Sequence, residues 1–244
     1  MKAETRVAVV TGGGRGLGRA SALRLAEDGR DVVIAEIEDF GAEVVAEIES
    51  LGQQARFIRT DVSDRTSVEA LVGETLSSFG RLDILVACAG ILGPEKSFLE
   101  VTDEDWEGVL AVNLTGVFYC CRAALPHMLE RGWGRVVTFS SGARRGSPSR
   151  QPYGTSKGGV VALTKAIAKE FAPRGVLANC VEPGRSLTQM VIPRFSPEHL
   201  ANPPEVPIGR YAEPEEVAEV VAFLCSERCT YTAGAVYQVA GGAS

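Results

Sequence analysis

The chain has 244 residues, 45% of them hydrophobic and 23% charged, which is ordinary for a soluble globular protein with a sizeable core. Its formal net charge of −6 argues against nucleic acid and anionic membranes as partners, because both favour basic surfaces. No apolar run approaches the roughly 20 residues that cross a bilayer, and no signal peptide opens the chain, so we expect a cytoplasmic protein.

Short β-branched runs alternate with longer segments of helical period along the chain. We predict strands at 6–10, 31–35, 55–59, 82–88, 135–140, 176–181 and 235–240. We predict helices near 16–28, 39–51, 64–79, 103–131, 154–172 and 214–225. This alternation indicates βαβ units, and the near-continuous apolar strands indicate a parallel sheet buried on both faces. The expected fold is therefore a single α/β domain covering 1–244.

The first strand is followed by "TGGGRGLG" (11–18), which opens the first helix. Gly12, Gly16 and Gly18 allow a tight turn and a close approach to a pyrophosphate at the helix amino terminus. The second strand ends in Glu36, 18 positions after Gly18 and near the spacing of a carboxylate that binds adenosine ribose hydroxyls. The pattern predicts dinucleotide binding, and the lack of GxxxxGK[ST] excludes the phosphate loop of nucleotide hydrolases.

Glu36 also bears on the choice of dinucleotide. A 2′-phosphate at ~4 Å from its carboxylate would cost about 1–4 kcal/mol, depending on the local dielectric. Arg15 acts in the opposite direction, because its guanidinium could pair with that phosphate. The carboxylate is the nearer group on the usual geometry, so we expect NAD as the cofactor, with NADP less favoured.

The segment "RQPYGTSKGG" (150–159) places Tyr153 and Lys157 four residues apart, on one face of a predicted helix. A free phenol has a pKa near ~10, and a neighbouring cation favours its phenolate form. Such a pair can hold and move the proton that carbonyl reduction or alcohol oxidation requires. An isolated YxxxK is more often a surface pair, but this one follows a predicted strand that ends in two serines, which favours a catalytic pair.

The remaining irregular stretch, 185–213, is the longest in the chain and is rich in proline. A loop of this length in a compact domain is more often functional, and we expect it to cover a substrate. Its apolar Met190, Val191, Ile192 and Phe195 predict a partly hydrophobic pocket. The six cysteines form no CxxC pair, so we expect buried thiols and no metal site.

Together these motifs resemble the short-chain dehydrogenase/reductases, nearly end to end. The matching stretches are "TGGGRGLG" (11–18), "TDVSD" with Asp61 and Val62, "NLTG" (113–116), the serines 140–141, "YGTSK" (153–157), "NCVEPGRSLT" (179–188) and the ending "YTAGAVYQVAGG". The resemblance implies a seven-stranded, Rossmann-like, doubly wound sheet with helices on both faces. It also implies a homotetramer or homodimer built on the long helices near 103–131 and 154–172.

The resemblance implies a catalytic group of Asn113, Ser141, Tyr153 and Lys157. Tyr153 would be the general acid and base, Lys157 would hold the nicotinamide ribose, and Ser141 would donate a hydrogen bond to the substrate oxygen. Asn113 would keep its helix locally open and hold a water of a proton relay. Ser140 is the alternative to Ser141, because it lies 13 positions before Tyr153, as is common in the family, whereas Ser141 lies 12.

The resemblance also implies a cofactor-binding set spread along the chain. Its members are Gly12, Arg15, Gly16, Leu17, Gly18, Glu36, Asp61, Val62, Cys88, Ala89, Gly90, Tyr153, Lys157, Pro183, Gly184, Ser186 and Thr188. Two of these depart from the family pattern. Cys88 stands where an asparagine is usual, which predicts weaker cofactor binding, and Ser186 stands at a usually apolar position beside the nicotinamide carboxamide.

Several functions stay open at this level. The first is an NAD(P)(H)-dependent oxidoreductase that interconverts a secondary alcohol and a ketone. The others are an NADP(H)-dependent 3-oxoacyl thioester reductase, a lyase or isomerase on the same fold, and a non-catalytic dinucleotide-binding sensor or scaffold protein. Arg144, Arg145 and Arg150, between serine and tyrosine, either hold an anionic substrate group or form a solvated basic loop.

Overall fold

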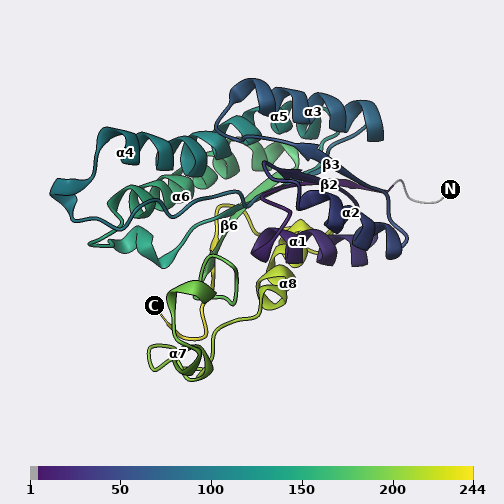
Figure 1. Cartoon of the computed structure of the whole chain (residues 1–244). Helices are drawn as coiled ribbons and strands as arrows, with labels where there is room; N and C mark the ends of the chain where they lie inside the picture. Colours follow the sequence, from purple (N-terminus) through teal and green to yellow (C-terminus); the bar gives the residue numbers. More distant parts are fainter. Residues whose placement is uncertain (1–4, 244) are drawn as a thin grey trace.

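A seven-stranded sheet forms the centre of the molecule, and each neighbouring pair of strands is parallel (Figure 1). The computed structural model describes residues 5–243, so the ends of the predicted domain, 1–4 and 244, lie outside it. The strands are β1 (Val7–Thr11), β2 (Asp31–Glu36), β3 (Ala55–Arg59), β4 (Ile84–Ala87), β5 (Gly134–Phe139), β6 (Val176–Pro183) and β7 (Val236–Val239). Their spatial order is β3-β2-β1-β4-β5-β6-β7, which confirms the predicted doubly wound, Rossmann-like fold.

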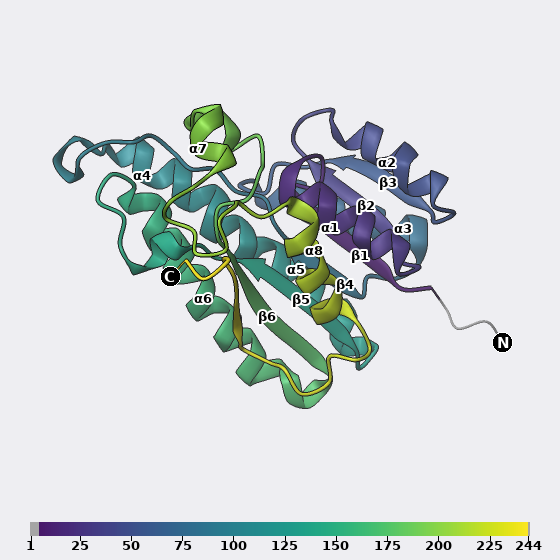
Figure 2. The ribbon, with the colours of Figure 1, turned by 90° about the horizontal axis from the view of Figure 1, so that it is seen from below.

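Helices cover both faces of this sheet. On one face lie α1 (Gly16–Glu27), α2 (Gly41–Ser50) and α8 (Pro214–Cys225), with α1 and α8 side by side (Figure 2). On the other face lie α3 (Arg65–Phe79), α5 (Gly116–Glu130) and α6 (Gln151–Phe171). Each face therefore has its own core, and β1 shows why its sequence is apolar throughout. Val7 and Val9 pack with α3, α5 and α6, whereas Ala8 and Val10 pack on the opposite face.

The structure differs from the predicted helices in three places. The predicted 103–131 helix is divided into α4 (Asp103–Leu110), a π-helical turn (Ala111–Thr115) and α5. Helix α6 begins three residues earlier than predicted, because Pro152 in its first turn suits a helix start and lacks only an N–H that would be unpaired there. The short helix α7 (Pro197–Ala201) inside the 185–213 segment was not predicted.

Contrary to the expectation from the sequence, the continuous Asp103–Glu130 helical stretch is, by length and composition, apolar enough to cross a membrane. Core helices of water-soluble proteins pass the same test. Here Val117, Cys121 and Met128 are buried in the core shared with α3, α6 and the sheet. Packing within the protein therefore accounts for this helix's apolar face.

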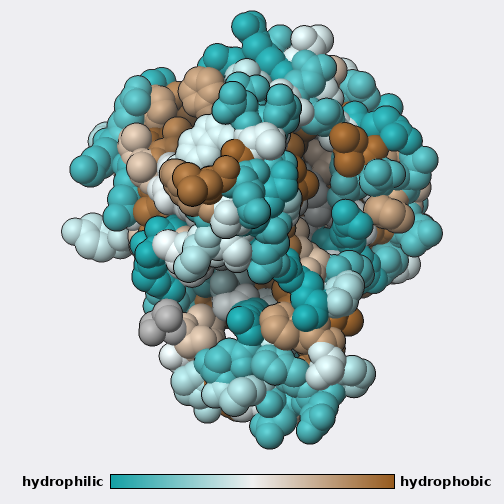
Figure 3. Space-filling model, turned by 60° about the vertical axis from the view of Figure 1, so that its left-hand side comes forward, coloured by the Kyte–Doolittle hydropathy of each residue, from teal (hydrophilic) through white to brown (hydrophobic). Residues whose placement is uncertain are grey.

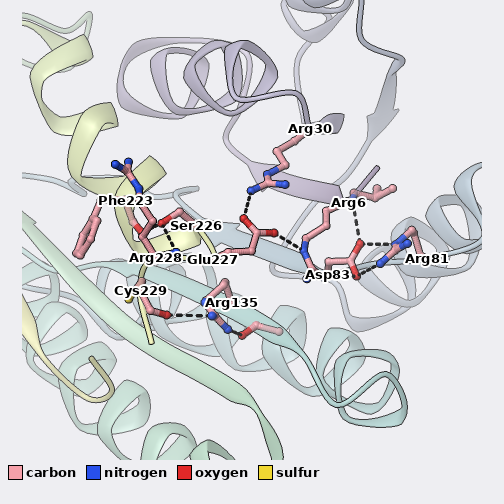
Figure 4. Close-up of polar contacts among 12 residues, drawn as sticks. Arg6, Arg30, Arg81, Asp83, Arg135, Phe223, Ser226, Glu227, Arg228 and Cys229 are labelled. Atoms are coloured by element: carbon pink, nitrogen blue, oxygen red, sulfur yellow. Dashed lines mark hydrogen bonds and ion pairs between the residues drawn. The ribbon is translucent and has the colours of Figure 1, made fainter. Parts of the chain in front are cut away.

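A network of charged side chains fixes the edge of the sheet where the strands begin (Figure 4). The buried Asp83 carboxylate accepts a hydrogen bond from the Val7 backbone N–H at 2.9 Å, and the Arg6 guanidinium lies 3.7 Å from it. Glu227, just after α8, pairs with Arg6 at 2.7 Å and with Arg30 at 2.6 Å. These contacts tie the starts of β1, β2 and β4 to α8, and they leave the opposite, carboxyl-terminal edge to the candidate site.

Candidate active site

The predicted site residues gather at the carboxyl-terminal edge of the sheet. Parallel strands end at the same edge, and the strand order reverses between β1 and β4, where ligands of such sheets bind. The glycine loop follows β1, Glu36 ends β2, the 88–90 segment follows β4, and Ser141 follows β5. The sheet therefore brings together segments that lie far apart in the sequence.

The glycine loop is packed tightly against the 88–90 segment and the 186–188 segment. Gly12 has φ +65°, and a Cβ there would lie 2.8 Å from the Ala89 Cα. A Cβ on Gly18 would lie 2.0 Å from the Gly12 carbonyl oxygen, so helix α1 also requires glycine at this position. Gly16 has φ +53° and lies against Thr188, with the Thr188 Cγ2 at 3.3 Å from its ideal Cβ position. The glycine loop, the 88–90 segment and the 186–188 segment thus form one wall of the candidate site.

The amino terminus of α1 is open at this wall. Arg15 is the residue that precedes the helix, and its side chain makes no capping hydrogen bond, while the first turn contains no acidic residue. Within residues 5–243, the first backbone N–H groups, including that of Leu17, have no side-chain acceptor, which is the arrangement that binds a phosphate. The Arg15 guanidinium instead lies over the Phe40 ring, 5.4 Å from its centre.

Glu36 and Asp61 hold fixed positions at the ends of β2 and β3. The buried Glu36 carboxylate accepts hydrogen bonds from the backbone N–H of Ile37 at 2.9 Å and of Gly14 at 3.4 Å. Asp61 accepts from the Ser63 N–H at 2.9 Å and from the Ser63 hydroxyl at 2.6 Å. A negative charge therefore lies directly under the glycine loop.

Val62 has a structural role beside these acids. It is buried, and a Cβ on Gly116 would lie 2.9 Å from its Cγ2, so α5 packs closely against the end of β3. This contact positions the 61–62 segment near the start of α5.

Asn113 joins the central helix to the 88–91 segment. It lies in the π-helical turn, fully buried, where its side-chain oxygen accepts from the Ile91 N–H and its amide donates to the Ile91 carbonyl, both at 2.8 Å. The helix opening that the resemblance implied is therefore present as this turn, a feature often found at functional sites. A Cβ on Gly90 would lie 3.2 Å from the Asn113 oxygen and 3.5 Å from the Lys157 ammonium.

The Lys157 ammonium is buried beside the Tyr153 ring. Its nitrogen lies 5.6 Å from the ring centre and donates to the Phe139 carbonyl at 2.9 Å. Among residues 5–243, no carboxylate forms an ion pair with it. A buried cation without an anion is costly, so this ammonium is suited to donate hydrogen bonds to ligand hydroxyls.

The two serines after β5 have different surroundings. The buried Ser140 hydroxyl donates to the Lys157 backbone carbonyl at 3.0 Å and so faces α6. Ser141 lies just before a 3-10 turn (Gly142–Arg145) and is partly exposed. Its side-chain oxygen accepts from the Ala143 N–H at 3.3 Å. Its hydroxyl hydrogen remains available for a ligand. The geometry therefore favours Ser141 over Ser140 as the donor to a substrate oxygen.

Two residues that depart from the family pattern also lie at this edge. Burial raises the pKa of the Cys88 thiol to about 12, although the Lys157 charge acts in the opposite direction, so the thiol stays neutral. The Ser186 hydroxyl is buried and has no hydrogen-bond partner among the described residues, while a backbone bridge to Ala212 fixes its position. An unpaired buried hydroxyl is costly, and a bound dinucleotide would supply the missing partner.

The open helix terminus and the unpaired Ser186 hydroxyl both fit a nicotinamide dinucleotide. Gly12, Gly16 and Gly18 allow the close packing that brings the loop backbone to the open end of α1. Pro183 ends β6, and a Cβ on Gly184 would lie 2.8 Å from the Ala240 Cα, so this second glycine turn is equally tight. Among the described residues no group of three His, Cys, Asp or Glu side chains is arranged to hold a metal ion.

Glu182 is a buried acid at this edge that the sequence analysis did not single out. It pairs with Arg144, with Arg145 at 2.7 Å and with Gln238 at 2.8 Å. Burial raises the pKa of Glu182, but the hydrogen bonds from Arg144 and Arg145 outweigh burial and keep it below its ordinary value. These two arginines therefore hold the loop to β6 and β7. The signal was an acid inside an otherwise apolar strand, next to Pro183.

Comparison with known proteins identifies the family of the chain. The sequence model described as "Enoyl-(Acyl carrier protein) reductase" matches residues 12–244. The chain belongs to the short-chain dehydrogenase/reductase family. It is 40% identical to cis-4-hydroxycyclohexanecarboxylate dehydrogenase of Sinomonas cyclohexanicum, over 97% of this chain and 96% of that protein. It is 34% identical to 2-dehydro-3-deoxy-L-rhamnonate dehydrogenase (NAD(+)) of a Sphingomonas species, over 97% and 94%.

A solved structure shows the same likeness in three dimensions. The 3-ketoacyl-(acyl-carrier-protein) reductase of Brucella melitensis, complexed with NADH, superposes with a TM-score of 0.91 at 33% identity and covers 99% of each chain. The protein is therefore an NAD(P)-dependent oxidoreductase of this family that acts on CH–OH groups.

Replacing Ser186 with alanine tests the fit of the dinucleotide. If the hydroxyl pairs with bound cofactor, Ser186→Ala loses about 0.5–1.5 kcal/mol of binding free energy, which weakens the NADH Kd about twofold to tenfold. The same change should not destabilise the cofactor-free protein, because there the hydroxyl is unpaired. NADH fluorescence titration and thermal melting measure the two effects, and Ser78→Ala, an exposed serine on α3, is the control. An unchanged Kd would contradict the assignment.

Proposed function

We propose that this oxidoreductase is an NAD(H)-dependent dehydrogenase that interconverts a secondary alcohol and a ketone. The observation that supports this most strongly is the buried Lys157 ammonium, which has no acidic partner in the described chain and lies beside the Tyr153 ring. A protein that only senses or binds a dinucleotide has no need of a phenol next to such a cation.

The four residues at the site divide the chemistry between them. The nicotinamide ring, when bound, supplies or accepts the hydride. Tyr153 donates a proton to the carbonyl oxygen during reduction and removes it from the hydroxyl during oxidation. Lys157 places a positive charge beside the Tyr153 ring, and Ser141 donates a hydrogen bond to the oxygen where charge develops. Asn113 holds the Ile91 backbone and so positions the segment beside the ammonium.

NAD(H) is the cofactor that the charge at the end of β2 favours. A 2′-phosphate on the adenosine ribose would meet the fixed Glu36 carboxylate, whereas two free hydroxyls can donate to it. Arg15, the cation that could offset this repulsion, is placed over Phe40. One relative carries NAD(+) in its name, and the Brucella melitensis reductase was solved with NADH, which also supports this choice.

The substrate class we propose is a small hydroxy acid or keto acid. The names of both curated relatives describe carboxylates, one on a cyclohexane ring and one a deoxy sugar acid. We propose that the 185–213 segment covers this substrate. In the space-filling view the part around α7 forms the lower lobe, and a hollow with hydrophobic side chains at its rim separates it from the main body (Figure 3).

A second candidate is a 3-oxoacyl thioester reductase, and likeness to the Brucella melitensis enzyme favours it. Acetoacetyl-coenzyme A, offered with NADH and with NADPH, distinguishes it from the first candidate. Assembly into a homodimer or homotetramer through the outer faces of α5 and α6 remains part of the proposal. The exposed Phe118 on α5, stacked under the Arg122 guanidinium, supports an interface there.

Tyr153→Phe tests the proposed function. Removing the phenolic oxygen takes away the only proposed proton donor, so kcat should fall about 10²-fold to 10⁴-fold while the NADH Kd stays within twofold. The assay follows NADH absorbance with a panel of cyclic, aromatic, sugar and acyl carbonyls. Tyr231→Phe, at a fully exposed tyrosine, is the matched control. Turnover that survives in Tyr153→Phe would contradict the mechanism. If the wild type binds NADH tightly but turns over none of the carbonyls, a dinucleotide sensor would be favoured instead.

Glu36→Ala tests the choice of cofactor. Without the carboxylate, kcat/KM for NADP⁺ should rise about fivefold or more, since the repulsion removed is about 1–4 kcal/mol, and kcat/KM for NAD⁺ should fall. Glu38→Ala, an exposed acid two residues further on, serves as the control. A wild type that prefers NADP⁺, or a variant with an unchanged preference, would overturn the Glu36 argument.

A further inference from the structure

We infer that Arg150 and Arg194 form the binding site for the substrate's carboxylate, and that Glu95 occupies this site as an exchangeable counter-ion when no substrate is bound. The inference rests on the proposed function, because it concerns the end of the substrate remote from the reacting carbinol. It assigns a recognition role to one arginine of the 142–152 loop and to one of the 185–213 segment.

Three segments that carry site residues meet at Glu95. One oxygen of its carboxylate accepts from the Arg150 guanidinium at 2.5 Å and from the Arg194 guanidinium at 2.8 Å. The other oxygen accepts from the Ser149 hydroxyl at 3.2 Å. A backbone hydrogen bond from Lys96 to Ser149, at 3.0 Å, holds the segment after β4 against the loop before α6.

The charges in this cluster do not balance. Two guanidinium groups share one carboxylate, which leaves one positive charge in excess. The neighbouring Lys96 does not supply an acid, because it pairs with Asp105 at 2.5 Å. An anion that entered this cluster would therefore be attracted even while Glu95 remains in place.

Both arginines are more buried than Glu95, since the Arg194 side chain is 30% exposed and that of Arg150 is less exposed still. The Arg150 side chain is 17% exposed, whereas that of Glu95 is 57% exposed. The Nε of Arg150 is buried and has no acceptor in the described structure. A guanidinium binds a carboxylate best through two parallel hydrogen bonds, and here Glu95 takes only a terminal nitrogen. A carboxylate that displaces Glu95 and takes both nitrogens fits this guanidinium better.

The position of Arg150 suits recognition of a substrate. It begins α6, since its carbonyl accepts from the Gly154 N–H at 2.9 Å, and Tyr153 follows three positions later. Residues three apart at a helix start have Cβ atoms about 5–6 Å apart, so Arg150 lies close to the proposed acid and base. Arg194 lies in a 3-10 turn (Ile192–Arg194) of the segment proposed to cover the substrate.

The Arg144 and Arg145 pair on the same loop differs from the Arg150 cluster in how deeply its carboxylate is buried. Arg144 and Arg145 share Glu182, whose side chain is only 3% exposed and is also bonded to Gln238. That carboxylate is closed off and cannot exchange for a ligand. The exposed Glu95 can, and Arg150 lowers its pKa below the ordinary value, so it is ionised at neutral pH and competes with the substrate.

Two variants of this cluster should act in opposite directions. Glu95→Gln removes the competing charge, so KM for a hydroxycyclohexanecarboxylate should fall about threefold to tenfold. Arg150→Gln removes the fixed donor, so the same KM should rise at least tenfold. The readout is KM of the acid divided by KM of its uncharged carboxamide, which cancels any general loss of activity. A merely structural ion pair predicts that both variants change this ratio equally or leave it unchanged.

The exposed pair Arg65 and Glu69 on α3, with a 2.7 Å contact, supplies matched controls. Arg65→Gln and Glu69→Gln remove an ion pair that involves none of Arg150, Arg194 and Glu95, and the ratio should stay at the wild-type value in both. A rise in the ratio for Glu95→Gln, or no rise for Arg150→Gln, would overturn the inference.

A binding measurement separates this inference from the proposed function. Cyclohexanecarboxylate has no hydroxyl and cannot react, so calorimetry with the NAD⁺-loaded protein reports recognition alone. We expect it to bind at least fivefold more tightly than cyclohexanecarboxamide, more tightly still in Glu95→Gln and more weakly in Arg150→Gln. Equal binding of acid and amide would overturn the inference even if alcohols are oxidised. Selective binding of the acid without turnover of any alcohol would contradict the proposed function alone.

Discussion

The Lys157 ammonium lies between Gly90, the Phe139 carbonyl and the Tyr153 ring, and none of the described carboxylates neutralises it. Removing such a charge from water is expensive unless polar groups or ligands replace the water. The surrounding architecture meets this constraint. Asn113 opens its helix to hold the neighbouring backbone, and α6 begins early enough to place Tyr153 one turn before the lysine. The proposed proton transfer depends on this one unbalanced charge.

Parallel pairing explains why so many separate segments reach this ammonium. Seven strands that run the same way place all their carboxyl-terminal ends at one edge, and the loops that follow them carry the polar groups. At the opposite edge the charged groups are paired instead. Asp83 and Glu227 there form ion pairs with arginines that hold β1 and β4 in place. Stability at one edge leaves the other free to keep the unpaired Ser186 hydroxyl and a Lys157 ammonium without a carboxylate among the described residues.

The sequence predicted the strands, most helix positions and the family, because these depend on local periodicity and on motifs that stand close together. Tyr153 and Lys157 could be paired from their spacing alone, whereas Asn113 and Ser141 needed the resemblance. The Glu182 and Glu95 clusters could not be predicted, because each joins segments dozens of residues apart whose contact depends on tertiary packing. The π-helical turn has no sequence periodicity of its own, so only the resemblance, through Asn113, indicated a helix opening there.

The most direct test of hydride transfer at this site uses NADH that carries deuterium at both C4 positions. The purified protein would be incubated with this cofactor and a ketone that it reduces, and the alcohol would be analysed by mass spectrometry. The account predicts that one deuterium appears on the carbinol carbon of each alcohol formed, whichever face of the nicotinamide is used. An alcohol formed without the label, or consumption of labelled cofactor without any alcohol, would contradict it.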